Sequence, residues 1–194
     1  LKVGPMLGVD RQPAAGAVIK TVHNPANHAD LVGEVVQADE ADVDAALTQA
    51  VVAAAAWAAV APAERAVMLE RAADLMQAEI ETLMGLLIRE AGKTASNAIS
   101  EVREAIDFLR YYAAQVRADF APDTHRALGP VVCISPWNFP LAIFTGQVAA
   151  ALAAGNPVLA KPAEQTCLIA AQAVRLLWQA GVPRAVVQLL PGRG

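Results

Sequence analysis

The chain has 194 residues, of which 56% are hydrophobic and 18% are charged, and its formal net charge is −4. This length suits one domain or slightly more, and the composition is that of a globular protein rather than a disordered one. The acidic balance, together with few aromatic residues and none interleaved with Lys or Arg, argues against nucleic-acid binding by this segment.

Two uncharged stretches, residues 45–63 and 127–160, are long enough to be mistaken for membrane spans. The first is rich in alanine and contains Thr48, Gln49 and Pro62, which favours a helix packed on protein. The second is interrupted repeatedly by Pro, Gly and Asn, which a bilayer helix would not tolerate without partners. The first residues do not show the basic start and short apolar run of a signal peptide, and we expect none in this segment. We therefore expect no transmembrane span.

The cysteines and histidines indicate neither a disulfide framework nor a metal site. Cys133 and Cys167 are two isolated cysteines, and the three histidines are scattered without metal-ligand spacing. A reducing cytoplasm is the default location. The chain begins with Leu1 rather than Met, which fits a piece of a longer polypeptide.

The first part of the chain predicts short strands followed by long helices. Residues 17–22 and 31–36 are β-like runs on either side of a turn at residues 24–27. Asp39 is a candidate N-cap for a helix that runs to about Ala59. Its apolar positions at helical spacing are Val43, Leu47, Ala50, Ala54 and Trp57.

Two further helices complete this first part. One is predicted to begin at Pro62 and to continue to Ala91, where Gly92 ends it. The next runs from Thr94 to about Val116, with an apolar side at helical spacing.

After a break near Gly129 the pattern changes to alternating strands and helices. Strands are predicted at residues 131–135, 157–160 and 185–190, with helices at residues 141–153 and 166–180 between them. Residues 1–128 therefore form an extended segment and a helical layer, and residues 129–194 form the first βαβαβ half of a Rossmann-like, doubly wound parallel sheet. The fold class is α/β.

Polar groups follow two of these strands, where open α/β sheets bind their ligands. Asn138 lies between Pro136 and Pro140, so its amide has little freedom and could donate to a developing oxyanion. The alternative is an Asn that satisfies a turn. Lys161 and Glu164 are three residues apart and could hold ribose hydroxyls, or could form a surface ion pair.

The string from Ile134 to Leu141, Ile-Ser-Pro-Trp-Asn-Phe-Pro-Leu, closely resembles a motif of the NAD(P)-dependent aldehyde dehydrogenases. The resemblance implies that Asn138 stabilises a thiohemiacetal oxyanion and that Lys161 and Glu164 bind the adenosine ribose. It also implies that the backbone of four residues lines the dinucleotide: Ile134, Ser135, Pro136 and Trp137.

A carboxylate at Glu164 should repel a 2′-phosphate, so the resemblance favours NAD over NADP as the cofactor. Gly192 and Gly194 form a Gly-x-Gly after the last strand, which is a weak signal by itself. We assign Gly194 only to close packing near the adenine side.

Residues 103–113 and 128–147 resemble a narrower group than the aldehyde dehydrogenases as a whole. They resemble the L-glutamate γ-semialdehyde (Δ1-pyrroline-5-carboxylate) dehydrogenase domain of the bacterial proline utilization A family. This implies a parent enzyme of proline catabolism, a homo-oligomer with FAD only in an upstream domain, acting on a small-molecule aldehyde. Glu104, Phe139 and Ile143 are then expected on the substrate tunnel, where a small Gly146 leaves room. Glu104 could instead pair with Arg103 or Lys93.

The expected nucleophile is missing. Cys133 lies in an apolar strand and should be inert, whereas Cys167 begins a helix, where a thiol pKa can fall, but has no base beside it. The resemblance places the catalytic Cys and the general-base Glu beyond this chain, which we expect to be an incomplete aldehyde dehydrogenase fold, inactive alone. The alternatives are an isolated NAD-binding module, a structural helical domain, and another member such as a succinate-semialdehyde dehydrogenase.

Overall fold

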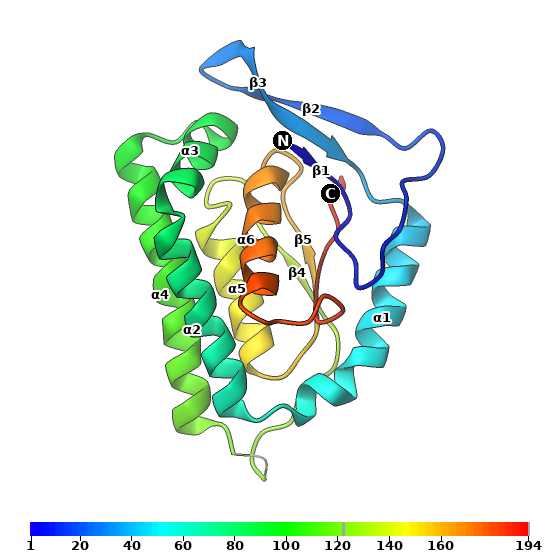
Figure 1. The fold of residues 1–194 in the computed structure, drawn as a ribbon, viewed down its shortest axis with the longest axis vertical. Coiled ribbons are helices and arrows are strands. Elements are labelled where there is room, and N and C mark those ends of the chain that lie inside the picture. Colours follow the sequence, from blue (N-terminus) through cyan, green and yellow to red (C-terminus); the bar gives the residue numbers. More distant parts are fainter. Residues whose placement is uncertain (122, 194) are drawn as a thin grey trace.

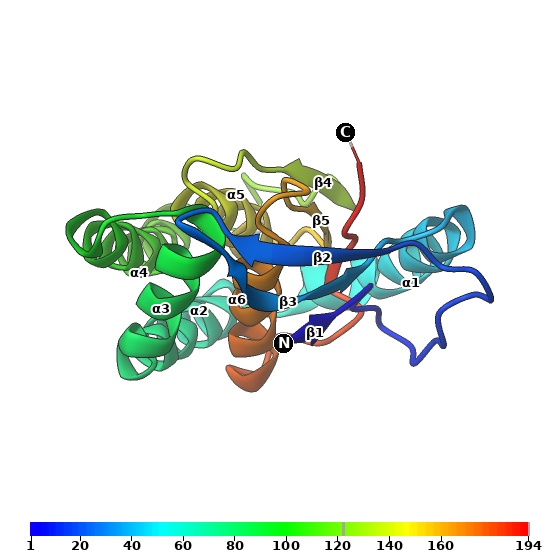
Figure 2. The same cartoon turned by 90° about the horizontal axis from the view of Figure 1, so that it is seen from above.

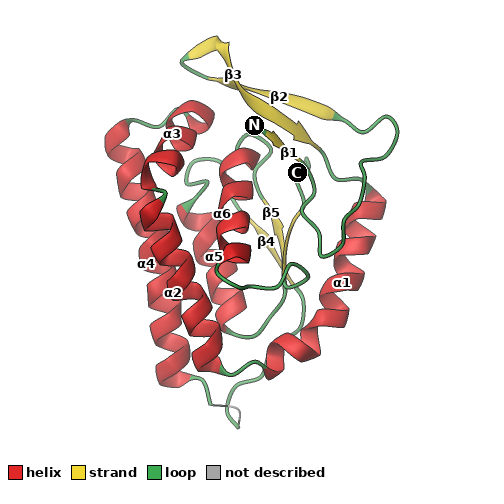
Figure 3. Ribbon diagram, viewed as in Figure 1, coloured by secondary structure: helices red, strands yellow, loops and turns green. Residues whose placement is uncertain are grey.

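The computed structural model describes residues 1–121 and 123–193. The elements in chain order are β1 (Lys2–Val3), β2 (Ile19–Asn24), β3 (Asn27–Val36), α1 (Glu40–Ala59), α2 (Pro62–Ala78), α3 (Ile80–Ala91), α4 (Ala95–Asp119), β4 (Val131–Ile134), α5 (Ala142–Ala153), β5 (Val158–Lys161), α6 (Cys167–Gln179) and β6 (Val187–Leu189). They form two small sheets and a layer of helices (Figures 1 and 3).

The first sheet has the strand order β1-β3-β2 and lies across the top of the molecule in Figure 1. β2 and β3 form an antiparallel hairpin, and β1 pairs with β3 in parallel. Both hairpin strands extend closer to the turn than the strands predicted at residues 17–22 and 31–36, because pairing continues to Asn24 and Asn27. The Ala26 N–H donates to Asn24 Oδ1 at 2.9 Å, which closes the turn.

The second sheet confirms the predicted α/β fold, since β4, β5 and β6 are parallel and adjacent in that order. α5 and α6 connect these strands, and α1 contacts β5 from the other side of the sheet (Figure 2). The free side of β6 is covered by the N-terminal segment, where Met6 and Leu189 exchange two backbone hydrogen bonds of 2.9 Å.

The helical layer consists of α2, α3 and α4, which pack against α5 and α6. Thr94 caps α4 by accepting from the Asn97 N–H at 3.2 Å. Gly92 ends α3 with a φ of 67°, as predicted. Buried apolar residues form a cluster that continues across residue 128, and the proposed domain boundary there stays a prediction.

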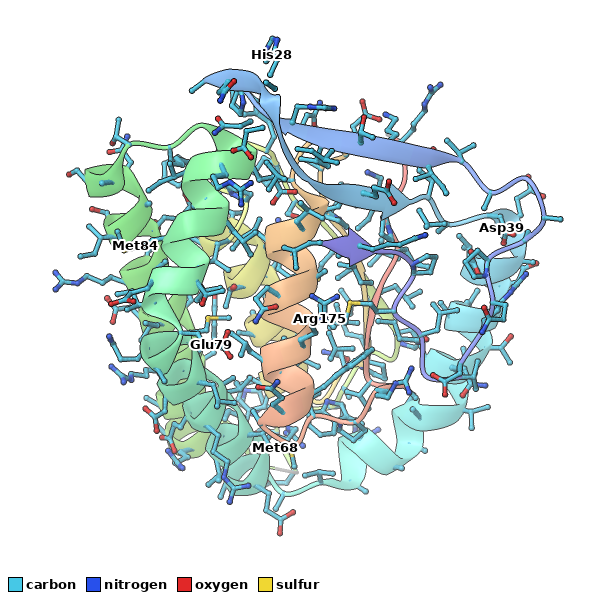
Figure 4. All side chains as sticks on the ribbon, turned by 45° about the horizontal axis from the view of Figure 1, so that its top comes forward. His28, Asp39, Met68, Glu79, Met84 and Arg175 are labelled. Carbon is cyan, nitrogen blue, oxygen red and sulfur yellow. The ribbon has the colours of Figure 1, made fainter. Side chains whose placement is uncertain are left out.

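The prediction of one helix from Pro62 to Ala91 is wrong. Glu79 interrupts it with a φ of −100° and a ψ of 21°, at the junction labelled in Figure 4. The sequence holds neither Pro nor Gly there, so tertiary contacts decide the break. α2 packs along α4, while α3 turns toward α6 and β2. Glu79 Oε2 accepts from Gln172 Nε2 of α6 at 2.8 Å, which ties the junction to that helix.

The predicted helix over residues 39–59 is confirmed, but its buried face is only partly the predicted one, since Ala50 and Trp57 are buried as predicted and Val43 and Leu47 are not. Asp39, labelled in Figure 4, accepts from the Asp42 N–H at 2.7 Å in a reciprocal capping box. Val43 and Leu47 are 44% and 46% exposed, whereas Ala46 is fully buried. The small alanine lets α1 approach the sheet closely enough for Gln188 Nε2 to donate to its carbonyl at 2.8 Å.

Within the described residues, no single helix is both long enough and apolar enough to cross a bilayer, and α1 and α2 would pass that test only together, as a pair bent by 112°.

The N-termini of α5 and α6 are capped by buried glutamates from the helical layer, which the sequence analysis did not identify. Neither helix has a side-chain cap of its own. Glu101 Oε1 accepts from the Leu141 N–H at 2.9 Å and from the Ala142 N–H at 3.4 Å.

Glu90 caps α6 in the same way and accepts from the Leu168 and Ile169 N–H groups at 2.7 and 2.8 Å. Burial raises the pKa of Glu90 to about 7, although the two N–H donors act in the opposite direction.

Gly146 does not leave the room that the sequence analysis expected. An added Cβ would lie 3.1 to 3.3 Å from three atoms of the Phe108 ring, so this aromatic side chain of α4 already fills the space. The glycine therefore serves the close packing of α5 on α4.

Enlarging that position should cost stability. We expect Gly146→Val to lower the free energy of unfolding by about 1–3 kcal/mol through overpacking, measured by thermal unfolding. In a Phe108→Ala background the same valine should cost less, because the ring that it would meet is gone. Gly85→Val on α3 is the matched control, because nothing lies within 4 Å of its added Cβ. Equal effects of the two valines would contradict this account.

Glu90 should make stability depend on pH. Its native pKa of about 7 exceeds the ordinary 4.5, so the folded state holds a proton that the unfolded chain releases. This contribution is complete below pH 4.5 and is lost as pH rises through 7, a change of about 3 kcal/mol.

Glu90→Gln should flatten this part of the stability profile in melting experiments between pH 5 and 8. Glu81→Gln, an exposed change on the same helix, should leave the profile as in the wild type. A wild-type slope that persists in Glu90→Gln would show that another group is responsible.

Candidate functional site

The carboxyl ends of β4 and β5 bring the two predicted groups of polar residues together. Ile134 pairs with Lys161 in the parallel register, and the Ser135 N–H donates to the Lys161 carbonyl at 3.2 Å. The loop of residues 135–140, here called the Asn138 loop, therefore begins beside the segment that carries Glu164. This edge of the sheet is where open α/β folds bind ligands.

The Asn138 loop has fixed ends and an exposed tip. Ser135 is buried at its start and Pro140 at its end, while Trp137 is 60% exposed. Asn138 is also exposed, and no hydrogen bond of its side-chain amide to another described residue is present, so the amide is available to a ligand. Its backbone carbonyl, by contrast, accepts from Lys93 Nζ at 2.5 Å.

Lys161 and Glu164 do not pair with each other. Lys161 Nζ donates to the Pro162 carbonyl at 3.1 Å, whereas Glu164 Oε2 accepts from Lys20 Nζ of β2 at 3.0 Å. Hydrogen bonding to Lys20 lowers the pKa of Glu164, so this carboxylate is ionised at neutral pH. Both predicted ribose ligands remain partly exposed, and Lys20 was missed because it is far away in sequence.

The residues predicted to line the substrate tunnel lie along α4 and α5. Glu104 is exposed on α4, one turn after Glu101, and Ile143 is partly buried on α5. Phe139 is 41% exposed at the loop. The alternative pairing of Glu104 with Lys93 is wrong, because the Lys93 ammonium lies 3.0 Å from Glu101 instead.

The remaining predicted contacts concern the cofactor. Ile134 is 65% exposed at the end of β4, in an open hollow between that strand and α5. Gly194, predicted to lie near the adenine, is outside the described residues. The roles assigned to these positions stay predictions.

Neither cysteine is suited to nucleophilic chemistry. Cys133 is 6% exposed and Cys167 is 1% exposed. Burial raises the pKa of Cys133 to about 11, and burial together with the nearby Glu90 raises that of Cys167 to about 12. The start of α6 therefore does not lower the pKa of Cys167, because loss of solvation outweighs the helix terminus.

The roles of Lys93, Glu90 and Glu101 were not predicted. The sequence contained one signal for Glu90. Glu90 continues the apolar stripe of Leu83 and Leu87 at helical spacing, and a carboxylate at such a position indicates a buried polar partner. Nothing in the sequence pairs Lys93 with the Asn138 loop. Among residues 1–121 and 123–193, no cluster of three or more His, Cys, Asp or Glu could hold a metal ion.

The chain is similar in sequence to bacterial enzymes of proline catabolism. The chain is 66% identical over 190 residues to the bifunctional protein PutA of Klebsiella aerogenes, covering 98% of this chain and 14% of that protein. It is 38% identical over 181 residues to the 1-pyrroline-5-carboxylate dehydrogenase of Staphylococcus haemolyticus, covering 87% of this chain and 35% of the relative.

Two solved structures are similar over 100% of this chain. PutA from Bdellovibrio bacteriovorus gives a TM-score of 0.93 at 32% identity, over 21% of its own chain. A 1-pyrroline-5-carboxylate dehydrogenase from Thermus with bound NAD gives 0.90 at 34% identity, over 40% of its chain. The chain spans 14% of the length of the PutA proteins that it matches. Residues 13–194 match the aldehyde dehydrogenase family model, and the chain belongs to that family.

Proposed function

We propose that the protein containing this chain oxidises L-glutamate γ-semialdehyde, formed from Δ1-pyrroline-5-carboxylate, to L-glutamate with NAD as the hydride acceptor. The observation that carries the proposal is the exposed Asn138 amide at the carboxyl end of β4, on a chain 66% identical to a PutA protein. In this role Asn138 Nδ2 donates a hydrogen bond to the oxygen that becomes negatively charged when the aldehyde carbon is attacked.

The groups around β4 and β5 fit a dinucleotide. Ser135 Oγ is buried at the end of β4 without a hydrogen-bond partner among the described residues, a condition that it shares with the hydroxyls of Thr145 and Thr166. Lys161 and the ionised Glu164 are available to a ribose. The N-termini of α5 and α6 cannot take the diphosphate, because Glu101 and Glu90 already occupy them. NAD, when bound, would supply the hydride-accepting ring.

The two cysteines described above stay protonated at neutral pH, so we assign the nucleophile and the general base to parts of the protein outside these 194 residues. Glu104, Phe139 and Ile143 are our candidates for contacts with the aldehyde. We also propose that the protein is a cytoplasmic homo-oligomer, with FAD confined to an upstream domain that oxidises proline, by analogy with its bifunctional relatives.

The first test is NADH formation by the full-length protein with glutamate γ-semialdehyde. We expect turnover by the wild type and a loss of about 10²–10³-fold in kcat for Asn138→Ala, since one oxyanion donor is removed. Cys133→Ala and Cys167→Ala serve as controls that should remain active. A silent wild type, or an Asn138→Ala variant of normal kcat, would refute the proposal.

Cofactor preference provides a second test. Glu164→Gln removes the negative charge at this position. It should raise the KM for NAD, and it should improve kcat/KM with NADP because the 2′-phosphate no longer meets a carboxylate. Steady-state kinetics with both cofactors measure the ratio. Glu34→Gln on β3, a partly exposed change in the first sheet, is the control. An unchanged NAD to NADP ratio in Glu164→Gln would remove Glu164 from the ribose site.

A further inference from the structure

We propose that Lys93, held in place by Glu101, is a positioning residue that fixes the Asn138 loop in its working geometry. This inference rests on the proposed function, because it assigns a role to Lys93 in the same reaction. Lys93 lies at the junction of α3 and α4, and Glu101 lies in α4.

The backbone of Lys93 is itself well fixed. It lies between Gly92, which ends α3 in the left-handed region, and Thr94, which caps α4. The Lys93 N–H donates to the Leu87 carbonyl at 3.2 Å. Because its backbone is fixed, a side chain at this junction can hold the loop in place relative to the helical layer.

The Lys93 ammonium makes three contacts that converge on one short segment. It donates to the Asn138 carbonyl at 2.5 Å and lies 4.3 Å from the centre of the Phe139 ring. It also lies 3.0 Å from Glu101 Oε2, at an angle that makes the contact an ion pair rather than an aligned hydrogen bond. The Lys93 side chain is 15% exposed, so these contacts are only weakly screened by solvent.

Glu101 connects the same ammonium to the far end of the loop. One of its carboxylate oxygens faces Lys93, and the other accepts the N–H groups of Leu141 and Ala142 at the start of α5. Its side chain is only 1% exposed. A buried carboxylate needs a compensating charge or donors, and here it has both.

The consequence is that the loop is held on both sides of the Asn138 side chain. Lys93 fixes the carbonyl of Asn138 and the ring that follows it, and Glu101 fixes the first amide of α5. The Asn138 side-chain amide remains free to meet a ligand. A displacement of about 1 Å in such a donor can cost on the order of 10²-fold in rate. Removing the contacts of Lys93 should therefore lower kcat.

The test uses the full-length protein and a double-mutant cycle. We expect Lys93→Met to lower kcat about 10- to 100-fold with little change in the KM for NAD, and Lys93→Arg to recover part of that loss. In an Asn138→Ala background, Lys93→Met should change kcat less than about 2-fold, because its effect passes through Asn138. Arg71→Met, an exposed change on α2, is the control.

A readout independent of activity separates this inference from the proposed function. Amide hydrogen exchange of residues 137–143 should become faster in Lys93→Met and stay unchanged in Arg71→Met. An inactive wild type would refute the proposed function, whereas unchanged exchange would overturn the positioning role. Equal losses of kcat in the two backgrounds would also overturn it, because Lys93 would then act independently of Asn138.

If Lys93→Met does not fold, Glu101→Gln takes its place. This variant keeps an oxygen for the Leu141 N–H but removes the charge that orients Lys93. It should give a smaller loss of kcat, with the same dependence on Asn138 and faster exchange in the same segment. Normal kcat and normal amide exchange in Glu101→Gln would overturn the positioning role of Lys93.

Discussion

Two buried carboxylates join the helical layer to the parallel sheet, and the geometry of the site depends on them. Glu101 caps α5 and Glu90 caps α6, each with two backbone N–H groups as donors. The first N–H groups of a helix have no partners within the helix and carry partial positive charge. Satisfying them from another layer fixes where both helices begin, and therefore where the loops after β4 and β5 lie.

The same caps decide where a dinucleotide can be held. Helix N-termini are the usual anion sites of nucleotide-binding folds. In this chain a carboxylate already occupies the N-termini of α5 and α6, the two helices that follow β4 and β5. The groups that remain to bind a ligand therefore lie at the ends of the strands. These are the hydroxyl of Ser135, the ammonium of Lys161 and the carboxylate of Glu164, whose ionisation is supported by Lys20.

The two glutamates differ in the charge that faces them. Glu101 has the ammonium of Lys93 at 3.0 Å, and this ion pair extends its influence from α5 to the Asn138 carbonyl. Glu90 has two N–H donors, and burial raises its pKa to about 7. Similar caps thus serve different purposes: one braces a loop, and the other makes the packing of α6 sensitive to protonation.

The sequence by itself determined the α/β class, the order of elements from Asp39 onward except for the division of one predicted helix into α2 and α3, the capping of α1 and the motifs at the ends of β4 and β5. These features depend on local periodicity, turn residues and short motifs, which a single stretch of chain contains in full. Only the tertiary structure decided the break at Glu79, the alanine face of α1, the filling of the space at Gly146 by Phe108, and the partners of Glu90 and Lys93. Each of these depends on contacts between elements far apart in sequence, where burial and close packing override what the local pattern favours.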